Sequence, residues 1–226
     1  MFISQRNDPM LPFRAVILDW SGTLVDDLDC VLEAGNHVFR AYGKAPFSRE
    51  EFREKFFLPL RDFYARYLPE VPLEELDQHF HAHYRAFRGK VTLFPEALPF
   101  LNQCRSNGLD LFLLSTIHPD HYETLAARFG LKHFFRCAMT SVGDKRTGLQ
   151  TLLSRYSLLP STTLFVGDMV HDVEAAHCAG VCSCAVLTGY DTESKLRRAR
   201  PTFLCSNLVE VEALLFDTTR QSFLQF

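Results

Sequence analysis

The sequence lacks the features that mark exported and membrane proteins. Its first 13 residues contain no apolar core of signal-peptide length, and no run approaches the length of a membrane span. The seven cysteines are odd in number and irregularly spaced, which argues against a secreted disulfide framework. We therefore expect a cytoplasmic protein with reduced thiols and no membrane partner.

A strong charge of either sign is also missing, as are internal repeats and low-complexity linkers. The formal net charge is only −3, so the composition offers no reason to expect a nucleic-acid partner. Hydrophobic residues at 47% and charged residues at 23% are ordinary for a globular protein, and 226 residues suffice for an α/β core with a smaller inserted domain. Nothing in the composition sets the oligomeric state.

Two apolar runs that end in aspartate are the most informative features present. Residues 15–18 lead directly into Asp19, and residues 163–167 lead into Asp168 in the same way. Short apolar runs of this kind are typical of buried parallel strands. Because the carboxyl ends of parallel strands meet at the edge where α/β sheets bind ligands, we expect the two acids to converge there.

The chain divides into a helical block and an alternating block. Residues 28–88 read as successive helices without a convincing strand, and Ser48 with Glu51 forms a capping box. From residue 93 onward, helical and strand patterns alternate, which predicts a parallel sheet with right-handed crossovers. We predict an α/β fold in which residues 1–27 and 89–226 form a Rossmann-like core and residues 28–88 an inserted helical cap.

Chemically active side chains fall at or just beyond the predicted strand ends. A carboxylate nucleophile, hydroxyl donors, an ammonium and an acid pair are the groups that phosphoryl transfer through a phospho-aspartate requires. Mg²⁺ takes oxygen ligands, commonly one or two carboxylates together with phosphate and water. The candidate residues are Asp19, Ser21, Gly22, Thr23, Ser115, Thr116, Lys145, Asp168 and Asp172.

The order and spacing of these motifs resemble the haloacid dehalogenase-like (HAD) hydrolases, in particular the phosphoglycolate phosphatase-like members of subfamily IA. Residues 19–26 resemble the first motif, D-x-D-G-T-L, and residues 111–115 the second. Lys145 stands for the third motif and residues 167–172 match the fourth, G-D-x-x-x-D. The resemblance implies Mg²⁺-dependent hydrolysis of a small phosphomonoester, a phosphorylated metabolite, through an aspartyl-phosphate.

The resemblance also implies a role for each matching residue. Asp19 is expected to be the nucleophile and a metal ligand, and Lys145 to neutralise the phospho-aspartate. Asp168 and the main-chain carbonyl of Ser21 are expected to bind the metal. Asp172 is expected to reach the metal through water or to orient Lys145. The residues expected to bind the substrate are Ser21, Gly22, Thr23, Ser115, Thr116 and, by its position in the cap, Arg61.

The first motif departs from the family pattern at Ser21. The family usually carries a second Asp there, which protonates the leaving group and then activates water. A serine hydroxyl is a poor proton shuttle at neutral pH, although related families carry Thr, Ala or Ser at this position. We expect an active enzyme with weak leaving-group protonation, and His171 beside the fourth motif is the first candidate for a substitute acid.

Two features of the cap allow more than one interpretation. Arg61 suits a second anionic group of the substrate, with a solvated surface charge as the equal alternative. His79, His81 and His83 form an alternating run, but no neighbouring acid or cysteine completes a zinc site. A satisfied or exposed pair of histidines on one helix face is therefore favoured.

Two other functions remain compatible with the sequence. Phosphonoacetaldehyde hydrolases share Asp-Trp in the first motif, and such an enzyme needs a cap lysine for a Schiff base, for which Lys44 and Lys55 are available. A catalytically weak phosphate-binding or interaction module is the second alternative. The retained Asp19 argues against it, because binding alone needs no nucleophile. A dehalogenase is disfavoured by the intact fourth motif.

Overall fold

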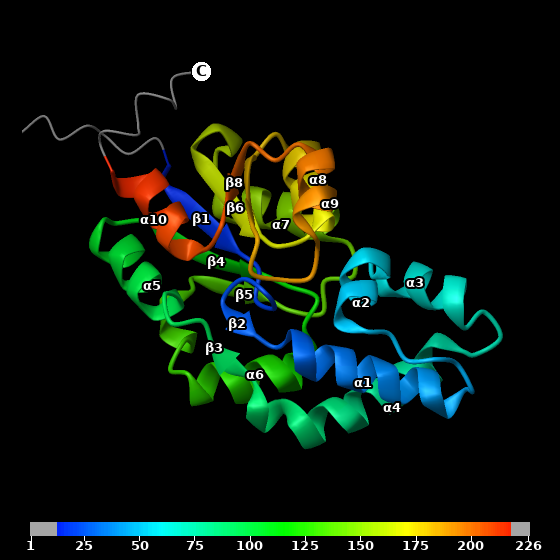
Figure 1. Cartoon of the computed structure of the whole chain (residues 1–226). Coiled ribbons are helices and arrows are strands. Elements are labelled where there is room, and N and C mark those ends of the chain that lie inside the picture. Colours follow the sequence, from blue (N-terminus) through cyan, green and yellow to red (C-terminus); the bar gives the residue numbers. More distant parts are fainter. Residues whose placement is uncertain (1–12, 218–226) are drawn as a thin grey trace, which may run out of the picture.

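A six-stranded parallel sheet forms the centre of the computed structural model, which describes residues 13–217 (Figure 1). The strand order is β5-β4-β1-β6-β7-β8, so β1 lies between two strands from distant parts of the chain. The carboxyl ends of β4, β1 and β6 are therefore side by side. The strands are β1 (Ala15–Leu18), β4 (Asp110–Leu114), β5 (Cys137–Met139), β6 (Thr163–Gly167), β7 (Cys182–Val186) and β8 (Phe203–Cys205).

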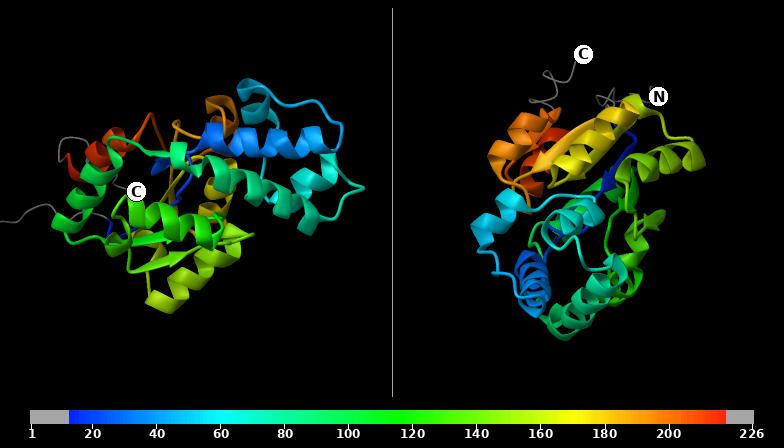
Figure 2. Two further views of the ribbon diagram at one scale, coloured as in Figure 1. Left: turned by 90° about the horizontal axis from the view of Figure 1, so that it is seen from below. Right: turned by 90° about the vertical axis from the view of Figure 1, so that its right-hand side faces the viewer.

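Alternation along each strand builds an apolar core on both faces of the sheet. Val16 and Leu18 of β1 pack on one face and Ile17 on the other. Because both faces are covered, the strands read as continuous apolar runs. This arrangement confirms the predicted Rossmann-like α/β class (Figure 2). One face is covered by α5 (Ala97–Ser106), α6 (Pro119–Arg128) and α10 (Leu208–Phe216), the other by α7 (Lys145–Tyr156), α8 (Val170–Ala179) and α9 (Glu193–Ala199).

Helices α1 to α4 pack mainly on one another, around an aromatic cluster that includes Phe39, Phe52 and Phe63. The predicted capping box of Ser48 and Glu51 opens α2. A short antiparallel pair, β2 (Val25–Asp26) with β3 (Thr92–Leu93), joins this helical segment to the sheet layer. Its helices are α1 (Leu28–Ala41), α2 (Arg49–Lys55), α3 (Leu60–Tyr67) and α4 (Leu73–Phe87).

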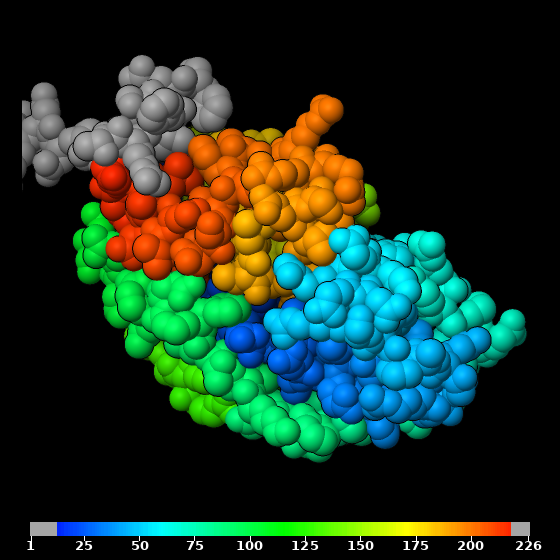
Figure 3. Space-filling view, viewed as in Figure 1, coloured from blue at the N-terminus to red at the C-terminus, as the bar shows by residue number. Residues whose placement is uncertain are grey.

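The helical segment contacts the sheet layer at two places. Near α9, Lys195 Nζ donates hydrogen bonds to the carbonyl oxygens of Arg53 and Phe56, at 3.0 and 2.9 Å. Figure 3 shows this contact as cyan residues against orange ones. Near α6, His81 of α4 makes a hydrogen bond of 3.1 Å with His121. Residues of both parts line a cavity of about 880 Å³.

The structure also contains elements that the sequence pattern did not predict. One is the cap of helix α7, which begins at Lys145 because Asp144 Oδ1 accepts the Arg146 N–H. Strand β8 at the edge of the sheet has only three residues, which is too short for a readable pattern. Within residues 13–217, every helix is too short or too polar to cross a membrane.

Candidate active site

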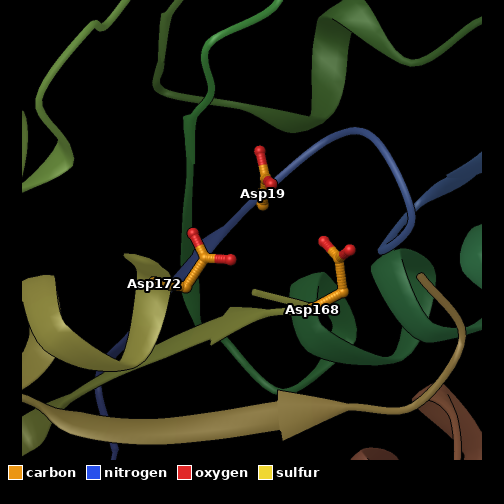
Figure 4. A group of neighbouring side chains, drawn as sticks. All are labelled: Asp19, Asp168 and Asp172. Carbon is orange, nitrogen blue, oxygen red and sulfur yellow. The ribbon is translucent and has the colours of Figure 1, made fainter. Parts of the chain in front are cut away.

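The ends of β1 and β6 bring three buried carboxylates together (Figure 4). Asp19 follows β1, Asp168 follows β6, and Asp172 lies in the first turn of α8. One carboxylate oxygen of each lies within 4.8 Å of the others, and none of the three residues is more than 4% exposed. The two strand-end acids thus lie at one edge of the sheet, together with the second acid of the fourth motif.

Lys145 is a buried cation that faces two of these acids. Its Nζ lies 2.7 Å from Asp19 Oδ2 and 2.6 Å from Asp172 Oδ1. Burial alone lowers the pKa of Lys145, but the two carboxylates together raise it above its ordinary value, so the ammonium stays charged. The lysine therefore orients the nucleophile candidate and Asp172 at the same time.

The charge and the donor atoms at this centre fit a divalent cation. Burial raises the pKa of Asp19 and of Asp168, and neighbouring carboxylates raise both further. Three buried carboxylates facing one ammonium leave an excess of negative charge, which is costly away from water. Because the available ligands are all oxygens, they suit a hard cation such as Mg²⁺. Asp19, Asp168 and Asp172 are the residues placed to hold it.

The turn after β1 brings the main chain close to Asp168. Gly22 has a φ of +70°, in the left-handed region that favours glycine, and a Cβ added there would lie 2.5 Å from Asp168 Oδ2. The hydroxyl of the fully buried Thr23 donates to Asp168 Oδ1 at 3.2 Å. The structure thus places Gly22 and Thr23 against Asp168, and their expected contact with substrate stays a prediction.

The end of β4 contributes two hydroxyl groups. Ser115 is buried, and its Oγ accepts the Ile117 N–H at 3.3 Å. Thr116 is exposed and lines the cavity. Of the two residues, only Thr116 belongs to the lining of the cavity.

Asp27, which the motif analysis did not select, lies beside Ser21. Ser21 Oγ donates to Asp27 Oδ2 at 2.6 Å, and the Tyr190 hydroxyl donates to Asp27 Oδ1 at 2.9 Å. Both Ser21 and Asp27 line the cavity. Burial raises the pKa of Asp27 to about 7, although the two hydrogen bonds lower it. Its place just before α1 is typical of a helix cap, yet its side chain makes no cap hydrogen bond.

The structure gives no support to His171 as the acid that replaces the missing carboxylate at position 21. The ring is buried, and neither nitrogen makes a hydrogen bond within residues 13–217. Burial is the main cause that lowers the pKa of His171 to about 4, and the ring is not part of the cavity wall. Arg61, in contrast, is exposed at the start of α3 and lines the cavity, as its predicted role requires.

The loop after β7 supports the centre from the other side. The Tyr190 N–H donates to Asp168 Oδ2 at 2.7 Å, and Thr188 Oγ1 donates to the Gly22 carbonyl oxygen at 2.6 Å. A Cβ added at Gly189 would lie 1.9 Å from Asp168 Oδ2. The local sequence reads only as a turn, so nothing in it identified these residues as part of the site.

We expect Gly189→Ala to weaken metal binding, because the added methyl group overlaps the Asp168 carboxylate and forces it to move. Changes in groups that support metal ligands typically cost about 10–100-fold in affinity, so the Mg²⁺ concentration for half-maximal activity should rise by at least about tenfold. Gly89→Ala is the matched control, because no atom lies within 4 Å of a Cβ there. An unchanged Mg²⁺ requirement would show that Asp168 tolerates the methyl group.

Comparison with known proteins agrees with this geometry. Residues 16–186 match the model of the haloacid dehalogenase-like hydrolase family. The chain is 30% identical over 199 residues to a phosphoglycolate phosphatase of Synechococcus elongatus, covering 84% of this chain and 92% of the relative. It is 22% identical over 214 residues to the pyrophosphatase PpaX of Oceanobacillus iheyensis, covering 92% of this chain and 99% of the relative.

Solved structures show the same fold. A haloacid dehalogenase-like family protein from Streptococcus pneumoniae aligns with a TM-score of 0.79 at 23% identity, covering 89% of this chain and 98% of that one. CbbY from Rhodobacter sphaeroides, solved with phosphate, aligns with a TM-score of 0.75 at 19% identity, covering 88% and 96%. The range that matches the family model includes the four residues of the buried centre, Asp19, Lys145, Asp168 and Asp172. The chain therefore belongs to the haloacid dehalogenase-like hydrolases, as a phosphatase of that family.

Proposed function

We propose that this protein hydrolyses a small phosphomonoester with Mg²⁺, through a phospho-aspartate formed on Asp19. The observation that carries the proposal is the buried centre in which Asp19 contacts Lys145 and lines the cavity. The names of the relatives, a phosphoglycolate phosphatase and a pyrophosphatase, also support a small phosphorylated substrate. In this proposal helices α1 to α4 form a cap that closes over the substrate and excludes water.

The contacts of Asp19 prepare it for attack. Its Oδ1 accepts the Trp20 N–H at 2.7 Å and its Oδ2 faces Lys145, so the carboxylate is held in one orientation. Attack forms a bond from Asp19 to phosphorus and breaks the bond to the leaving oxygen; water then hydrolyses the acyl phosphate and restores the carboxylate. Lys145 stabilises the charge of the phosphoryl group during both steps. Bound Mg²⁺ supplies Lewis-acid stabilisation of the phosphoryl oxygens.

Ser21 and Asp27 together provide the proton for the leaving group. When Asp27 is ionised, the Ser21 hydroxyl donates to it across the 2.6 Å between Ser21 Oγ and Asp27 Oδ2. When Asp27 is protonated, the direction reverses, and Ser21 can pass its own proton to the leaving oxygen while taking one from Asp27. With a pKa of about 7, Asp27 is protonated in roughly half of the molecules at neutral pH. The pair thus takes the place of the family's usual acid.

Removal of divalent cations is expected to reduce turnover to the background rate, because three buried carboxylates then face the phosphate with one ammonium. Excess EDTA tests this, and Mg²⁺ added beyond the chelator should restore the rate. EDTA already saturated with Mg²⁺ is the control for effects of the chelator itself. Full activity in free EDTA would remove Asp168 and Asp172 from the proposed metal site.

The alternative functions find less support. A phosphonoacetaldehyde hydrolase needs a lysine in the cavity, but no lysine of residues 13–217 lines it. Lys55 pairs with Glu51 at 3.2 Å on the surface, and Lys44 is exposed. Borohydride trapping with phosphonoacetaldehyde should therefore yield no adduct. For a binding module, the orientation of Asp19 by Trp20 and Lys145 would serve no purpose.

A screen of phosphorylated metabolites with purified protein and Mg²⁺ tests the proposed activity directly. Turnover of at least one small phosphoester supports it, and the absence of any turnover by folded protein that binds Mg²⁺ contradicts it. We also propose a cytoplasmic location, which the odd number and irregular spacing of the seven cysteines support.

A further inference from the structure

We infer that the cavity contains a second anion-binding subsite, formed by His81 from α4 and His118 at the start of α6, which binds a second anionic group of the substrate. This inference deepens the proposed function and rests on it. The two rings come from opposite sides of the cavity wall, the helical segment and the sheet layer, and their centroids are 4.7 Å apart. Together they could bind the same carboxylate or phosphate.

A chain of hydrogen bonds leaves an N–H donor on His81. Arg88 Nη1 lies 3.3 Å from His121 Nδ1, and because a guanidinium can only donate, this nitrogen accepts and His121 carries its proton on Nε2. His121 Nε2 lies 3.1 Å from His81 Nδ1 and donates to it. Neutral His81 therefore carries its proton on Nε2, which has no hydrogen-bond partner within residues 13–217. The chain of hydrogen bonds thus runs from the charged Arg88 through His121 to His81, which lines the cavity.

His118 offers a second donor of the same kind. Its Nδ1 accepts the Asp120 N–H at 3.2 Å, so the neutral ring carries its proton on Nε2. That N–H also lacks a hydrogen-bond partner in the described part of the chain. His118 follows Thr116 by two residues, and both residues line the cavity. A substrate in this cavity can therefore meet both the Thr116 hydroxyl and the two imidazole donors.

Charges of both signs surround this pair of rings. Arg85 of α4 and Arg88, which directly follows that helix, contribute positive charge, and Asp77 of α4 and Asp120 of α6 contribute negative charge. Burial, the neighbouring imidazoles and the arginines hold the pKa of His81 near 4 and that of His121 near 3. His81 thus offers an N–H donor without charge until an anion arrives.

This environment couples anion binding to proton uptake. An anion beside the two rings favours the protonated form of His81 and raises its pKa. Affinity for a second anionic group should therefore rise as the pH falls through the raised pKa of His81 in the occupied site, until free His81 protonates near pH 4. A substrate of the same size without the second charge should not show this dependence.

The rest of the histidine run has a different structural role. His79 packs against Tyr42, and His83 stacks on His37 of α1 with centroids 4.1 Å apart. The only groups of potential metal ligands that converge within residues 13–217 are the three aspartates, so the run is not a zinc site. His79, on the opposite side of α4 from the cavity wall, provides a matched control for His81.

The test compares 2-phosphoglycolate with ethyl phosphate, which has a methyl group where the first has a carboxylate. His81→Phe keeps a ring but removes the donor, and losing a hydrogen bond to a charged group should lower the ratio of their kcat/KM values by about tenfold to a hundredfold, mainly through KM. His81→Gln retains an N–H and should recover part of the ratio. His79→Phe should leave it unchanged. If Arg61→Gln removes the preference for 2-phosphoglycolate over ethyl phosphate and His81→Phe does not, the proposed subsite of His81 and His118 is wrong.

A binding experiment separates this inference from the proposed activity. Asp19→Asn protein with Mg²⁺ is titrated calorimetrically with both compounds near pH 6, in buffers of different ionisation enthalpy. Proton uptake on binding of 2-phosphoglycolate, but not ethyl phosphate, supports the subsite when His81→Phe abolishes it. If this proton uptake is seen but the wild-type protein hydrolyses no phosphoester, the proposed hydrolase activity is wrong and the anion-binding subsite stands. Hydrolysis of both compounds with no effect of His81→Phe contradicts the subsite and retains the hydrolase.

Discussion

Asp19→Asn is expected to lower the turnover of every phosphoester substrate by at least about 10⁴-fold, because loss of a covalent nucleophile costs orders of magnitude. The amide cannot attack phosphorus and loses the charge that pairs with Lys145 at 2.7 Å. Lys145 keeps its contact with Asp172 at 2.6 Å, and the side chain barely changes in volume, so the fold should persist. Steady-state rates and circular dichroism spectra of both proteins check the two parts of this prediction.

A trapping experiment identifies the step that is lost. Rapid acid quenching of wild-type protein with a labelled substrate should leave phosphate covalently bound to the chain, and Asp19→Asn should show none. Asp110→Asn is a matched control, because Asp110 forms an exposed ion pair with Arg136 at the other end of β4. Near-normal rates for Asp19→Asn would contradict the phospho-aspartate route even if the protein were a genuine phosphatase.

The convergence of the acids could be predicted because it depends on local and general rules. An apolar run identifies a buried strand, and parallel strands place their carboxyl ends at one edge, so Asp19 and Asp168 required no knowledge of long-range packing. The resemblance to a known family then supplied roles for Ser115 and Lys145. What it could not supply was the consequence of the departure at Ser21, because no motif describes the partner of that residue.

The hydrogen bonds that hold Asp27 and Asp168 depend on contacts between distant segments. Tyr190 donates to Asp27 across 163 residues of sequence, and its N–H also supports Asp168. A turn such as the one at Gly189 has no local pattern that reveals a carboxylate lying against it. The sequence likewise predicted that His81 lies on a helix. The contact of its ring with that of His118 depends on how the helical segment lies over the sheet layer.

Asp27→Asn is expected to slow the hydrolysis of alkyl phosphates by about 10²–10⁴-fold, the usual contribution of general acid catalysis. Aryl phosphates should be affected far less, because their leaving groups need little protonation. Since Asp27 acts in its protonated form, the wild-type kcat for an alkyl phosphate should fall as the pH rises through about 7, and this limb should disappear in Asp27→Asn. Asp26→Asn, at the neighbouring exposed position, is the matched control.

Ser21→Asp tests the same proton path from the other side. It places the family's usual acid at the position whose hydroxyl now lies 2.6 Å from Asp27 Oδ2, so two carboxyl groups come to share one proton near neutral pH. We expect the rate ratio of alkyl to aryl phosphate to rise at saturating Mg²⁺, because the acid then reaches the leaving oxygen without the serine relay. In Ser21→Asp combined with Asp27→Asn, the ratio should stay high, since the new carboxyl no longer needs Asp27. If Asp27→Asn, Ser21→Asp and the double variant all leave this ratio unchanged with intact Mg²⁺ binding, neither Ser21 nor Asp27 delivers the proton. A bound water would then deliver it.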